Sequence, residues 1–417
     1  MTTAWLRDQV ADLYTRNRQQ GTATWSGSEY DFVCPSTVTY PFQWFWDSCF
    51  HAIALSHFDA GRAESEIAGL LANQQDDGFI PHVIFWQRER FEASVSTYAI
   101  AFRTNWLSDQ MQPPLLAEAV EATARRGRGT EYLAEVLPAL RRFYDWCHDV
   151  RDPDGDGLIA VLQADETGLD HSPKFDDYLG IAAPTDEEFL AGWHRVADPY
   201  AKADRRPAEM FSLDRFVVED VMVNTIYAEN LRVLADLCRL VGDDEGDSRY
   251  RARAEATTRA LVDKCWDSDR GLFFDLAGIA ERHLEVNTVT SLFPLLLTGI
   301  TNDVVERLVG HLTDPAEYDA PFPVPSVAMS EEGYDPGVVG RNLVWRGPTW
   351  MNSNWYLVRG LRRHGHTDLA NRIVDRSIEL VRRNGFREYY NPETGEGNGA
   401  PDFSWTAIVL DMVEIDT

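Results

Sequence analysis

The chain has 417 residues and a formal net charge of −28 at pH 7, with a sequence pI near 4.7. Charge of that sign and size repels a phosphate backbone, and no basic stripe offsets it, so we expect no nucleic acid as a partner. The content of 44% hydrophobic and 25% charged residues is typical of a globular protein, and no segment is long and apolar enough to cross a membrane. Helical and barrel architectures of this length often share one core, so we predict a single domain over residues 1–417.

The first twenty residues and the cysteines bear on location. The stretch MTTAWLRDQVADLYTRNRQQ predicts an amphipathic helix with charges throughout, without the apolar core of a secretory signal. The cysteines are odd in number, and their spacing is not that of metal ligands. They are Cys34, Cys49, Cys147, Cys238 and Cys265. We therefore expect a protein of the reducing cytoplasm.

Helical periodicity continues along the whole chain. Between 131 and 149, for example, apolar residues recur at three- and four-residue steps, which indicates one buried stripe. Strand signals are few, and no repeat typical of an open solenoid is detectable, so the helices favour a closed ring of hairpins. We predict an all-α fold, an (α/α)6 barrel with long active-site loops. The expected helices lie near 3–19, 46–58, 62–75, 95–107, 131–149, 216–241, 247–265, 287–298, 302–312, 348–364, 367–384 and 403–414.

Four stretches are expected to be poor in helix, near 20–45, 76–94, 151–213 and 313–347. Connections this long are unusual in a compact domain and commonly carry function. We expect the loops near 76–94 and 151–213 to close over a substrate, because hydrolysis benefits from a positioned water and the exclusion of bulk solvent.

Three segments are rich in aromatic residues, YPFQWFWDSCFHAI at 40–53, WRGPTWMNSNWYL at 345–357 and FREYYNPETGEG at 386–397, and the first and third also contain acids. Aromatic faces stack on the apolar faces of pyranose rings, and carboxylates hold hydroxyls or move the protons that glycosidic cleavage requires. The pattern is therefore typical of a sugar-cleaving enzyme.

Each of these segments also has a purely structural interpretation. Asp47 could cap a helix over core tryptophans, although three aromatic residues in a row, 44–46, are hard to bury together. Arg346 could be a structural arginine on a packed helix. Among the acids of the third segment, Glu388 is flanked by aromatic residues, which favours a pocket with a raised proton affinity. Glu393 and Glu396 lie in a turn and are expected to face solvent.

The region 152–177 is rich in acids, and several of them compete for one role: Asp165, Glu166, Asp170, Asp176 and Asp177. At its start, Asp152, Asp154 and Asp156 match the first half of a calcium loop, but Gln163 stands where such a loop has a bidentate glutamate. A solvated turn and a calcium site both remain open there. The ten histidines form no HExxH motif, and neither GxSxG nor a phosphate loop occurs, so we expect no cofactor and no catalytic metal.

In their order along the chain, eight motifs make the sequence resemble glycoside hydrolase family 63, especially its bacterial mannosylglycerate and glucosylglycerate hydrolases. They are YPFQWFWD, GFIPHVIF at 78–85, QPP at 112–114, ETGLDHSPKFD at 166–176, VED at 218–220, WRGPTW, EYYNPETGE and SWTA at 404–407. The resemblance implies an (α/α)6 barrel that inverts the anomeric carbon, with Asp170 as general acid and Glu388 as general base. Asp47 would then grip sugar hydroxyls. The sugar subsite implied by the resemblance also contains Tyr40, Trp44, Trp46, Gln112, Trp345, Arg346, Gly347, Trp350 and Trp405.

The function that the resemblance implies is hydrolysis of a small α-glucoside or α-mannoside, glycerate conjugates among them. In the stretch after the acid motif, Arg195, Arg205 and Arg206 are candidates for binding a carboxylate. An α-glucosidase or trehalase-like hydrolase acting on oligosaccharides, and a non-catalytic sugar-binding protein, are the alternatives. The expected partner is a small carbohydrate, and assembly into a homo-oligomer stays open.

Overall fold

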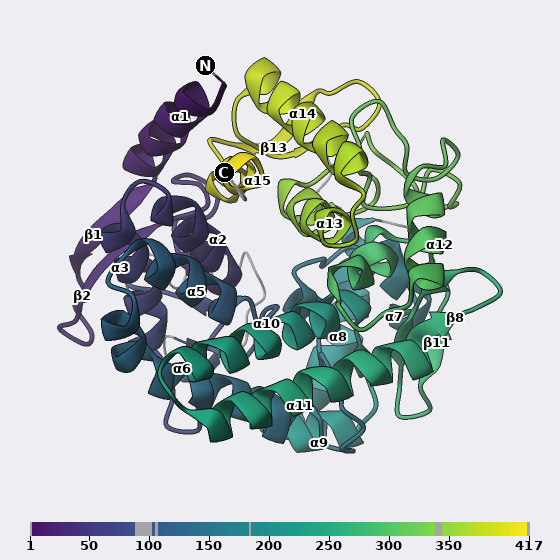
Figure 1. The fold of residues 1–417 in the computed structure, drawn as a ribbon. Helices are drawn as coiled ribbons and strands as arrows, with labels where there is room; N and C mark the ends of the chain where they lie inside the picture. Colours follow the sequence, from purple (N-terminus) through teal and green to yellow (C-terminus); the bar gives the residue numbers. More distant parts are fainter. Residues whose placement is uncertain (1, 88–101, 105–106, 183–184, 338–343, 415–417) are drawn as a thin grey trace.

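The computed structural model describes residues 2–87, 102–104, 107–182, 185–337 and 344–414. Six helical elements follow one another around an inner ring, and each packs on the next until the last returns to the first (Figure 1). These inner elements are α2 (Phe45–Ser56), α5 (Leu116–Arg126), α10 (Val221–Leu240), the 3-10 helix η5 (Val289–Leu296), α13 (Met351–Arg363), and the 3-10 helix η6 (Ser404–Ile408), which continues into α15 (Val409–Glu414).

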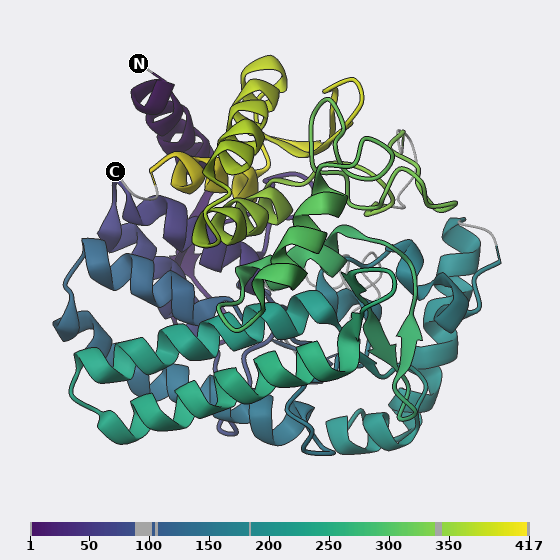
Figure 2. The ribbon, with the colours of Figure 1, turned by 45° about the vertical axis from the view of Figure 1, so that its right-hand side comes forward.

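An outer helix packs against each inner element. In the same order these partners are α3 (Ala60–Leu71), α6 (Thr130–Arg151), α11 (Asp244–Ala260), α12 (Asn302–Leu312), α14 (Thr367–Asn384) and α1 (Thr2–Arg16). The pair α10 and α11 lies side by side in both views (Figure 2). The double ring confirms the predicted (α/α)6 barrel.

The sequence accounts for which helices are inside. Every residue of α2 is buried, as expected of a helix that is apolar on all sides. By contrast, α14 buries a single stripe at three- and four-residue steps and exposes charged residues elsewhere. Helices of the first kind form the inner ring, because only there are both faces covered.

Some helix predictions are wrong. The 151–213 stretch is not poor in helix, since it contains α7 (Asp176–Leu179), α8 (Asp186–Lys202) and α9 (Pro207–Ser212). The inner helix α5 was also absent from the prediction. Of the helix expected at 95–107, residues 102–104 form strand β5 and 107–108 form β6, whereas 95–101 and 105–106 lie outside the described residues. The helix expected at 287–298 is 3-10 in character and contains Pro294, which lacks the N–H that an α-helix would use.

Short strands place the connecting loops around the ring. A four-stranded sheet in the order β3 (Gln43–Trp44), β4 (Val83–Ile84), β6 (Leu107–Ser108) and β5 (Phe102–Thr104) joins the stretch before α2 to the connection between α3 and α5. A second sheet pairs β10 (Asp275–Ala277) with both β11 (Arg282–Leu284) and β7 (Val218–Glu219). The remaining strands form hairpins: β1 (Arg18–Thr22) with β2 (Glu29–Val33), β8 (Trp266–Asp267) with β9 (Leu272–Phe273), and β12 (Arg387–Tyr390) with β13 (Gly397–Pro401).

Helix α8 lies behind the ring in Figure 1 and beside it in Figure 2, so it covers one end of the barrel. Of the helices that the structure describes, none combines the length and the apolar character needed to cross a membrane.

Candidate active site

The residues singled out by the sequence gather at the N-terminal ends of the inner helices. Asp47 is in the first turn of α2, Trp350 directly precedes α13, and Trp405 is the second residue of η6. Gln112 lies shortly before α5, and its side-chain oxygen accepts a hydrogen bond from the Trp46 backbone N–H at 3.1 Å. One end of the barrel therefore carries the candidate site.

The loop that carries Asp170 runs from residue 164 to residue 176, and we call it the acid loop. Two buried ion pairs hold it. Near its start, the Arg151 guanidinium donates to both carboxylate oxygens of Glu166, at 2.7 and 2.6 Å. Near its end, the Lys174 ammonium lies 2.5 Å from a carboxylate oxygen of Asp220 and 2.8 Å from one of Asp275. Such pairs fix geometry more than they add stability, because desolvation offsets their attraction.

Gly168 explains how closely the acid loop approaches α2. Its φ of +71° lies in the left-handed region, and a Cβ there would collide with the Trp46 ring. Only glycine combines this φ with so close an approach to the Trp46 ring. Gly168 therefore lets the acid loop pack on the Trp46 indole at a point two residues before Asp170.

Asp170 is partly exposed, yet its carboxyl group is shielded from bulk water. Burial raises the pKa of Asp170 well above its usual value, and the negative charges of Asp165 and Glu388 raise it further. Asp165 in turn accepts a hydrogen bond from the Trp193 indole N–H at 3.1 Å, and burial raises the pKa of Asp165 to about 6. The surroundings of Asp170 therefore favour the protonated form of its carboxyl.

Glu388 lies on β12 and is 9% exposed. One of its carboxylate oxygens accepts a hydrogen bond from the Tyr40 hydroxyl at 3.2 Å, and the other accepts from the Ala400 N–H at 2.8 Å. Burial raises the pKa of Glu388, and both of these donors oppose the rise. Gly399, with φ +67°, leaves the room that this carboxylate occupies, since a Cβ there would stand 2.6 Å from Oε2.

Asp47 is 4% exposed. Burial raises its pKa to about 8, and the charge of Glu388 contributes to that rise. Since the charge of Glu388 acts on both Asp47 and Asp170, the three carboxyls share one electrostatic environment, although they come from distant parts of the sequence.

Tryptophans form the floor of this region. The rings of Trp345 and Trp350 stack with centroids 3.7 Å apart and an angle of 8° between the planes. Trp405 meets Trp350 edge to face at 5.6 Å and Trp46 at 5.3 Å. The indole N–H groups of Trp350 and Trp405 are buried without a hydrogen-bond partner among the described residues.

Tyr40 and Trp44 form a second, more exposed aromatic pair, with rings at 6.1 Å in an edge-to-face arrangement. Trp46 is only 2% exposed, whereas Trp44 is partly exposed. The run of aromatic residues at 44–46 is therefore split between buried and partly exposed positions, and its sequence indicated that the three would not be buried together.

Arg346 has a structural partner in this structure. Its guanidinium donates to both oxygens of Asp176, at 2.9 and 2.5 Å, and lies 5.2 Å from the Phe189 ring. The neighbouring Gly347 donates its N–H to the Ser326 hydroxyl at 2.9 Å. Both contacts hold the turn before α13 in place, and that of Arg346 connects it to the end of the acid loop. A direct contact of Arg346 with a sugar stays a prediction.

Two residues that shape this site, Lys174 and Trp193, were absent from the sequence-based candidates, and Asp176 was named there only among the acids that compete for one role. Lys174 and Asp176 anchor the acid loop, and Trp193 orients Asp165. Lys174 and Asp176 lie within the ETGLDHSPKFD motif, so the motif itself could have indicated them. Trp193 could not have been found while α8 was missing from the prediction.

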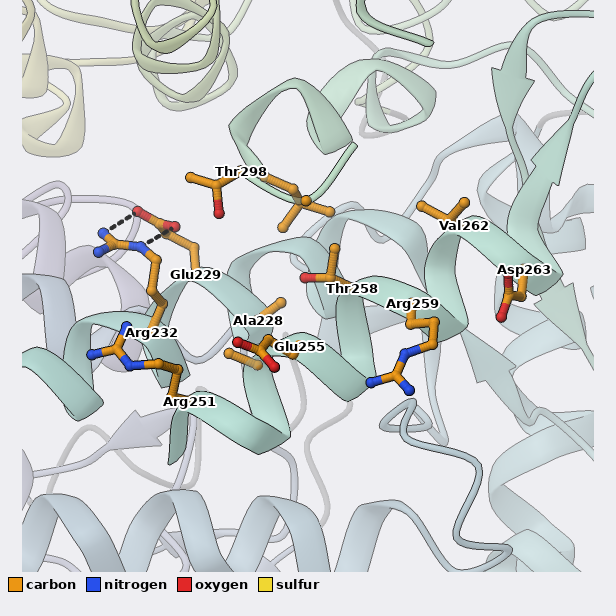
Figure 3. Close-up of a pocket in the computed structure, with 13 residues that line it drawn as sticks. Ala228, Glu229, Arg232, Arg251, Glu255, Thr258, Arg259, Val262, Asp263 and Thr298 are labelled. Atoms are coloured by element: carbon orange, nitrogen blue, oxygen red, sulfur yellow. Dashed lines mark hydrogen bonds and ion pairs between the residues drawn. The ribbon is translucent and has the colours of Figure 1, made fainter. Parts of the chain in front are cut away.

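The structure also has a hollow of about 450 Å³ between α10, α11 and residues 297–299. Figure 3 shows that charged side chains project into it, among them Arg232, which donates to both oxygens of Glu229 at 2.9 and 2.8 Å. None of the predicted site residues lines it. We therefore assign the candidate site to the cluster of acids and tryptophans.

A barrel of paired helices with three acids and an aromatic floor at one end is the construction of a glycoside hydrolase. Comparison with known proteins defines the family. The pattern of the mannosylglycerate hydrolase MGH1-like glycoside hydrolase domain matches residues 40–406, and the chain belongs to that family, in glycoside hydrolase family 63.

The chain is similar over almost its full length to individual members. It is 27% identical to the mannosylglycerate hydrolase of Rubrobacter radiotolerans, with 97% of each chain covered. It is 28% identical to the glucosylglycerate hydrolase of Mycolicibacterium hassiacum, with 90% of this chain and 92% of the relative covered.

Among solved structures, the family 63 mannosylglycerate hydrolase of Thermus thermophilus in complex with Tris superposes with a TM-score of 0.84 at 27% identity. That match covers 98% of this chain and 99% of the other. The neutral trehalase Nth1 of Saccharomyces cerevisiae, with a TM-score of 0.58 at 16% identity, shares the fold alone; that match covers 97% of this chain and 79% of the trehalase.

Proposed function

We propose that this glycoside hydrolase inverts the anomeric carbon of a small α-glucoside or α-mannoside, with Asp170 as general acid and Glu388 as general base. The observation that carries the proposal is that two acids in one site have different surroundings, which act differently on their pKa values. Negative neighbours and burial raise the pKa of Asp170 well above its usual value, whereas two hydrogen-bond donors oppose the rise at Glu388.

In this mechanism, the protonated Asp170 donates its proton to the glycosidic oxygen while the bond from that oxygen to the anomeric carbon breaks. Glu388 takes a proton from a water whose oxygen forms a new bond to the anomeric carbon on the opposite face of the ring. A separation of roughly 6.5–9.5 Å between the carboxyl groups leaves room for that water. The products are a β-sugar and the free aglycone, and a second proton transfer returns both carboxyls to their starting states.

In the proposed subsite, Asp47 and the tryptophan floor bind the sugar. At neutral pH, a carboxyl with a pKa of about 8 can donate a hydrogen bond to a sugar hydroxyl. The indole N–H groups of Trp350 and Trp405 add two donors, and the exposed faces of Tyr40 and Trp44 suit stacking on the ring.

We further propose that the aglycone carries a carboxylate, as in glucosylglycerate or mannosylglycerate, the substrates that the relatives' names indicate. Of the three arginine candidates, Arg195 donates to backbone carbonyls of residues 179 and 180, and Arg206 pairs with Glu209 at the surface. Arg205 differs from both. It pairs with Asp109 through Nε and has a buried Nη2 without a partner among the described residues.

Arg205 also lies close enough to Asp165 for its positive charge to oppose the rise in the pKa of that acid. Asp165 in turn acts on Asp170, so this guanidinium belongs to the neighbourhood of the proposed acid. A carboxylate on the leaving group could there accept charge-assisted hydrogen bonds from Arg205.

The test is a comparison of kcat/KM for α-glucosylglycerate and α-mannosylglycerate with that for uncharged or longer α-linked sugars, namely glucosylglycerol, trehalose, kojibiose and maltose. Arg205→Gln is expected to reduce turnover of the glycerate conjugates at least roughly tenfold while leaving glucosylglycerol nearly unchanged. The matched control Arg206→Gln is expected to change neither. Equal losses on charged and uncharged substrates would refute the role of Arg205, and absence of turnover on the whole panel would favour the sugar-binding alternative.

We propose, too, that residues 1–417 form one domain and that the protein works in a reducing compartment such as the cytoplasm. The closed ring of inner helices, which spans residues 45–414, supports the first point. Cys49, Cys147, Cys238 and Cys265 are buried thiols outside any disulfide, which supports the second.

A further inference from the structure

Helix α8 contacts the acid loop on both sides of Asp170. The Trp193 indole N–H donates to Oδ2 of Asp165 at 3.1 Å. One helical turn earlier, the Phe189 ring meets the His171 ring edge to face, with centroids 4.9 Å apart. Side chains four residues apart project from the same face of a helix. The proposed general acid is therefore flanked along the chain by two contacts with one face of α8.

The Asp165 carboxyl is shielded from bulk water and is held by neutral donors. Besides the Trp193 indole, the Gln110 side-chain amide lies 3.5 Å from the same carboxylate oxygen. That amide also donates to the Gln163 side-chain oxygen at 3.0 Å, and both glutamines are buried. Burial raises the pKa of Asp165, and the two donors oppose the rise. Neutral donors thus favour the ionised form of this carboxyl without cancelling its charge.

Two charged neighbours also act on Asp165, and each is bound to a partner of its own. No ion pair to Asp165 exists among the residues that the structure describes, so its negative charge acts on Asp170 together with that of Glu388 from β12. The two neighbours are Glu166, which pairs with Arg151, and Arg205, which pairs with Asp109.

We propose that Asp165 is a positioning residue that keeps the proton on Asp170, and that Trp193 holds Asp165 in place for this role. The inference rests on the proposed role of Asp170 as general acid. An ionised Asp165 makes loss of the proton from Asp170 unfavourable, because two like charges would then share one shielded site. Without the indole, the Asp165 carboxylate can turn toward the Arg205 guanidinium and act less on Asp170. Through Trp193, helix α8 thereby controls how firmly the acid holds its proton.

The direct test follows the Trp193 indole by NMR, in protein whose tryptophan rings carry nitrogen-15. The signal is assigned by its loss in Trp193→Phe. As the pH rises, this N–H signal is expected to shift in two steps, the lower from ionisation of Asp165 and the upper from ionisation of Asp170. Asp170→Asn should abolish the upper step. Asp165→Asn should abolish the lower step and move the upper one down by about one pH unit or more, because removal of the neighbouring charge lowers the pKa of Asp170.

The titration needs no turnover, so its result is independent of whether the protein hydrolyses any substrate offered to it. An upper step that persists in Asp170→Asn, or that does not move in Asp165→Asn, would overturn the proposal. Turnover that survives Asp170→Asn would instead refute the general acid itself, whatever the titration shows.

The pH profile of kcat/KM extends the test to catalysis. Asp165→Asn should move the alkaline limb to lower pH by about one unit or more, because Asp170 then loses its proton earlier. Trp193→Phe should move the limb in the same direction by about half a unit. It should add no further shift in Asp165→Asn, where no charge is left to hold. The matched controls, Asp177→Asn at an exposed position and Trp266→Phe on the β8–β9 hairpin, should leave the limb in place.

A purely structural role of these residues predicts a different result. It would lower kcat or the melting temperature of Asp165→Asn and leave the alkaline limb where it is in the natural chain. That outcome would overturn the proposal, and so would shifts of Asp165→Asn and Trp193→Phe that simply add in the double variant.

Discussion

The acid loop, residues 164–176, and the hairpin β12–β13 hold their carboxyls in opposite ways. Around Asp170 the neighbours are negative, Asp165 and Glu388, and they favour the protonated form. Around Glu388 the neighbours are donors, the Tyr40 hydroxyl and the Ala400 N–H, and they favour the ionised form. In the proposed mechanism, one fold thus supplies an acid and a base from the same chemical group by changing only what surrounds it.

The two regions also differ in how they are held in place. Buried ion pairs fix the acid loop. The hairpin that carries Glu388 is fixed instead by backbone hydrogen bonds between β12 and β13 and by the close approach of Gly399 to the Glu388 side chain. A change in the loop's anchors should therefore affect stability, and a change beside Glu388 should affect the pH dependence.

Asp170→Asn and Glu388→Gln are each expected to lower kcat by roughly a thousandfold, because each removes a group that transfers a proton. Both substitutions preserve size, so the melting temperature should change little. The control is Asp177→Asn, since the Asp177 side chain is 88% exposed and is expected to be dispensable for catalysis. Activity within tenfold of the natural enzyme in either variant would end that role assignment.

Lys174→Met should lower the free energy of unfolding by about 3–5 kcal/mol, because Asp220 and Asp275 would remain buried without their cation. Urea unfolding followed by circular dichroism measures this. Arg376→Met removes an ion pair with Glu379 on the exposed face of α14 and should change stability very little. A loss at Lys174 no larger than that at Arg376 would contradict the anchoring of the acid loop.

Tyr40→Phe should shift the acidic limb of the kcat/KM profile upward by about half a pH unit to one unit. The hydroxyl lowers the pKa of Glu388, so its removal raises that pKa, and the ionised base is then lost at a higher pH as the solution is acidified. A pH profile that spans the acidic limb and neutral pH checks this. Tyr132→Phe on α6 serves as control, and a limb that moves downward, or not at all, would refute the contact.

The smallest effect concerns loop closure. Binding of an unhydrolysed substrate to Glu388→Gln is expected to slow protease cleavage between residues 203 and 215, since this stretch directly follows α8, whose Trp193 contacts Asp165. Limited proteolysis with and without substrate measures the rate. Identical cleavage rates would show that this stretch does not close over the substrate.

Sequence periodicity predicted the inner helices α2, α10 and α13 close to their observed bounds, because an apolar run of that length has few alternatives. It missed α5, LAEAVEATARR, whose buried stripe is largely alanine. It also missed α8, which contains Pro199 and many charged residues. In α8, tertiary packing compensates for a weak local signal, whereas α5 consists mainly of strong helix formers and is weak only in hydrophobic contrast.

The candidate site also contains features that the local sequence predicts and features that only tertiary contacts determine. The acids and tryptophans stand beside one another in short motifs, so the sequence indicated them. The contacts that set their chemistry join residues far apart in the chain, such as Tyr40 with Glu388 and Trp193 with Asp165. No local pattern contains such a pair, and only the closed ring brings its members together.

The central claim is that Asp170 and Glu388 act on opposite faces of the sugar ring in a single displacement. A proton NMR time course of the hydrolysis of α-glucosylglycerate or α-mannosylglycerate tests it directly, because the first sugar released shows its anomeric form before mutarotation. With the proposed inverting mechanism, the β-anomer is expected to appear first, and the α-anomer is expected to grow later at the mutarotation rate. Initial release of the α-anomer would mean retention through a covalent intermediate and would contradict the assignment of Glu388 as a base.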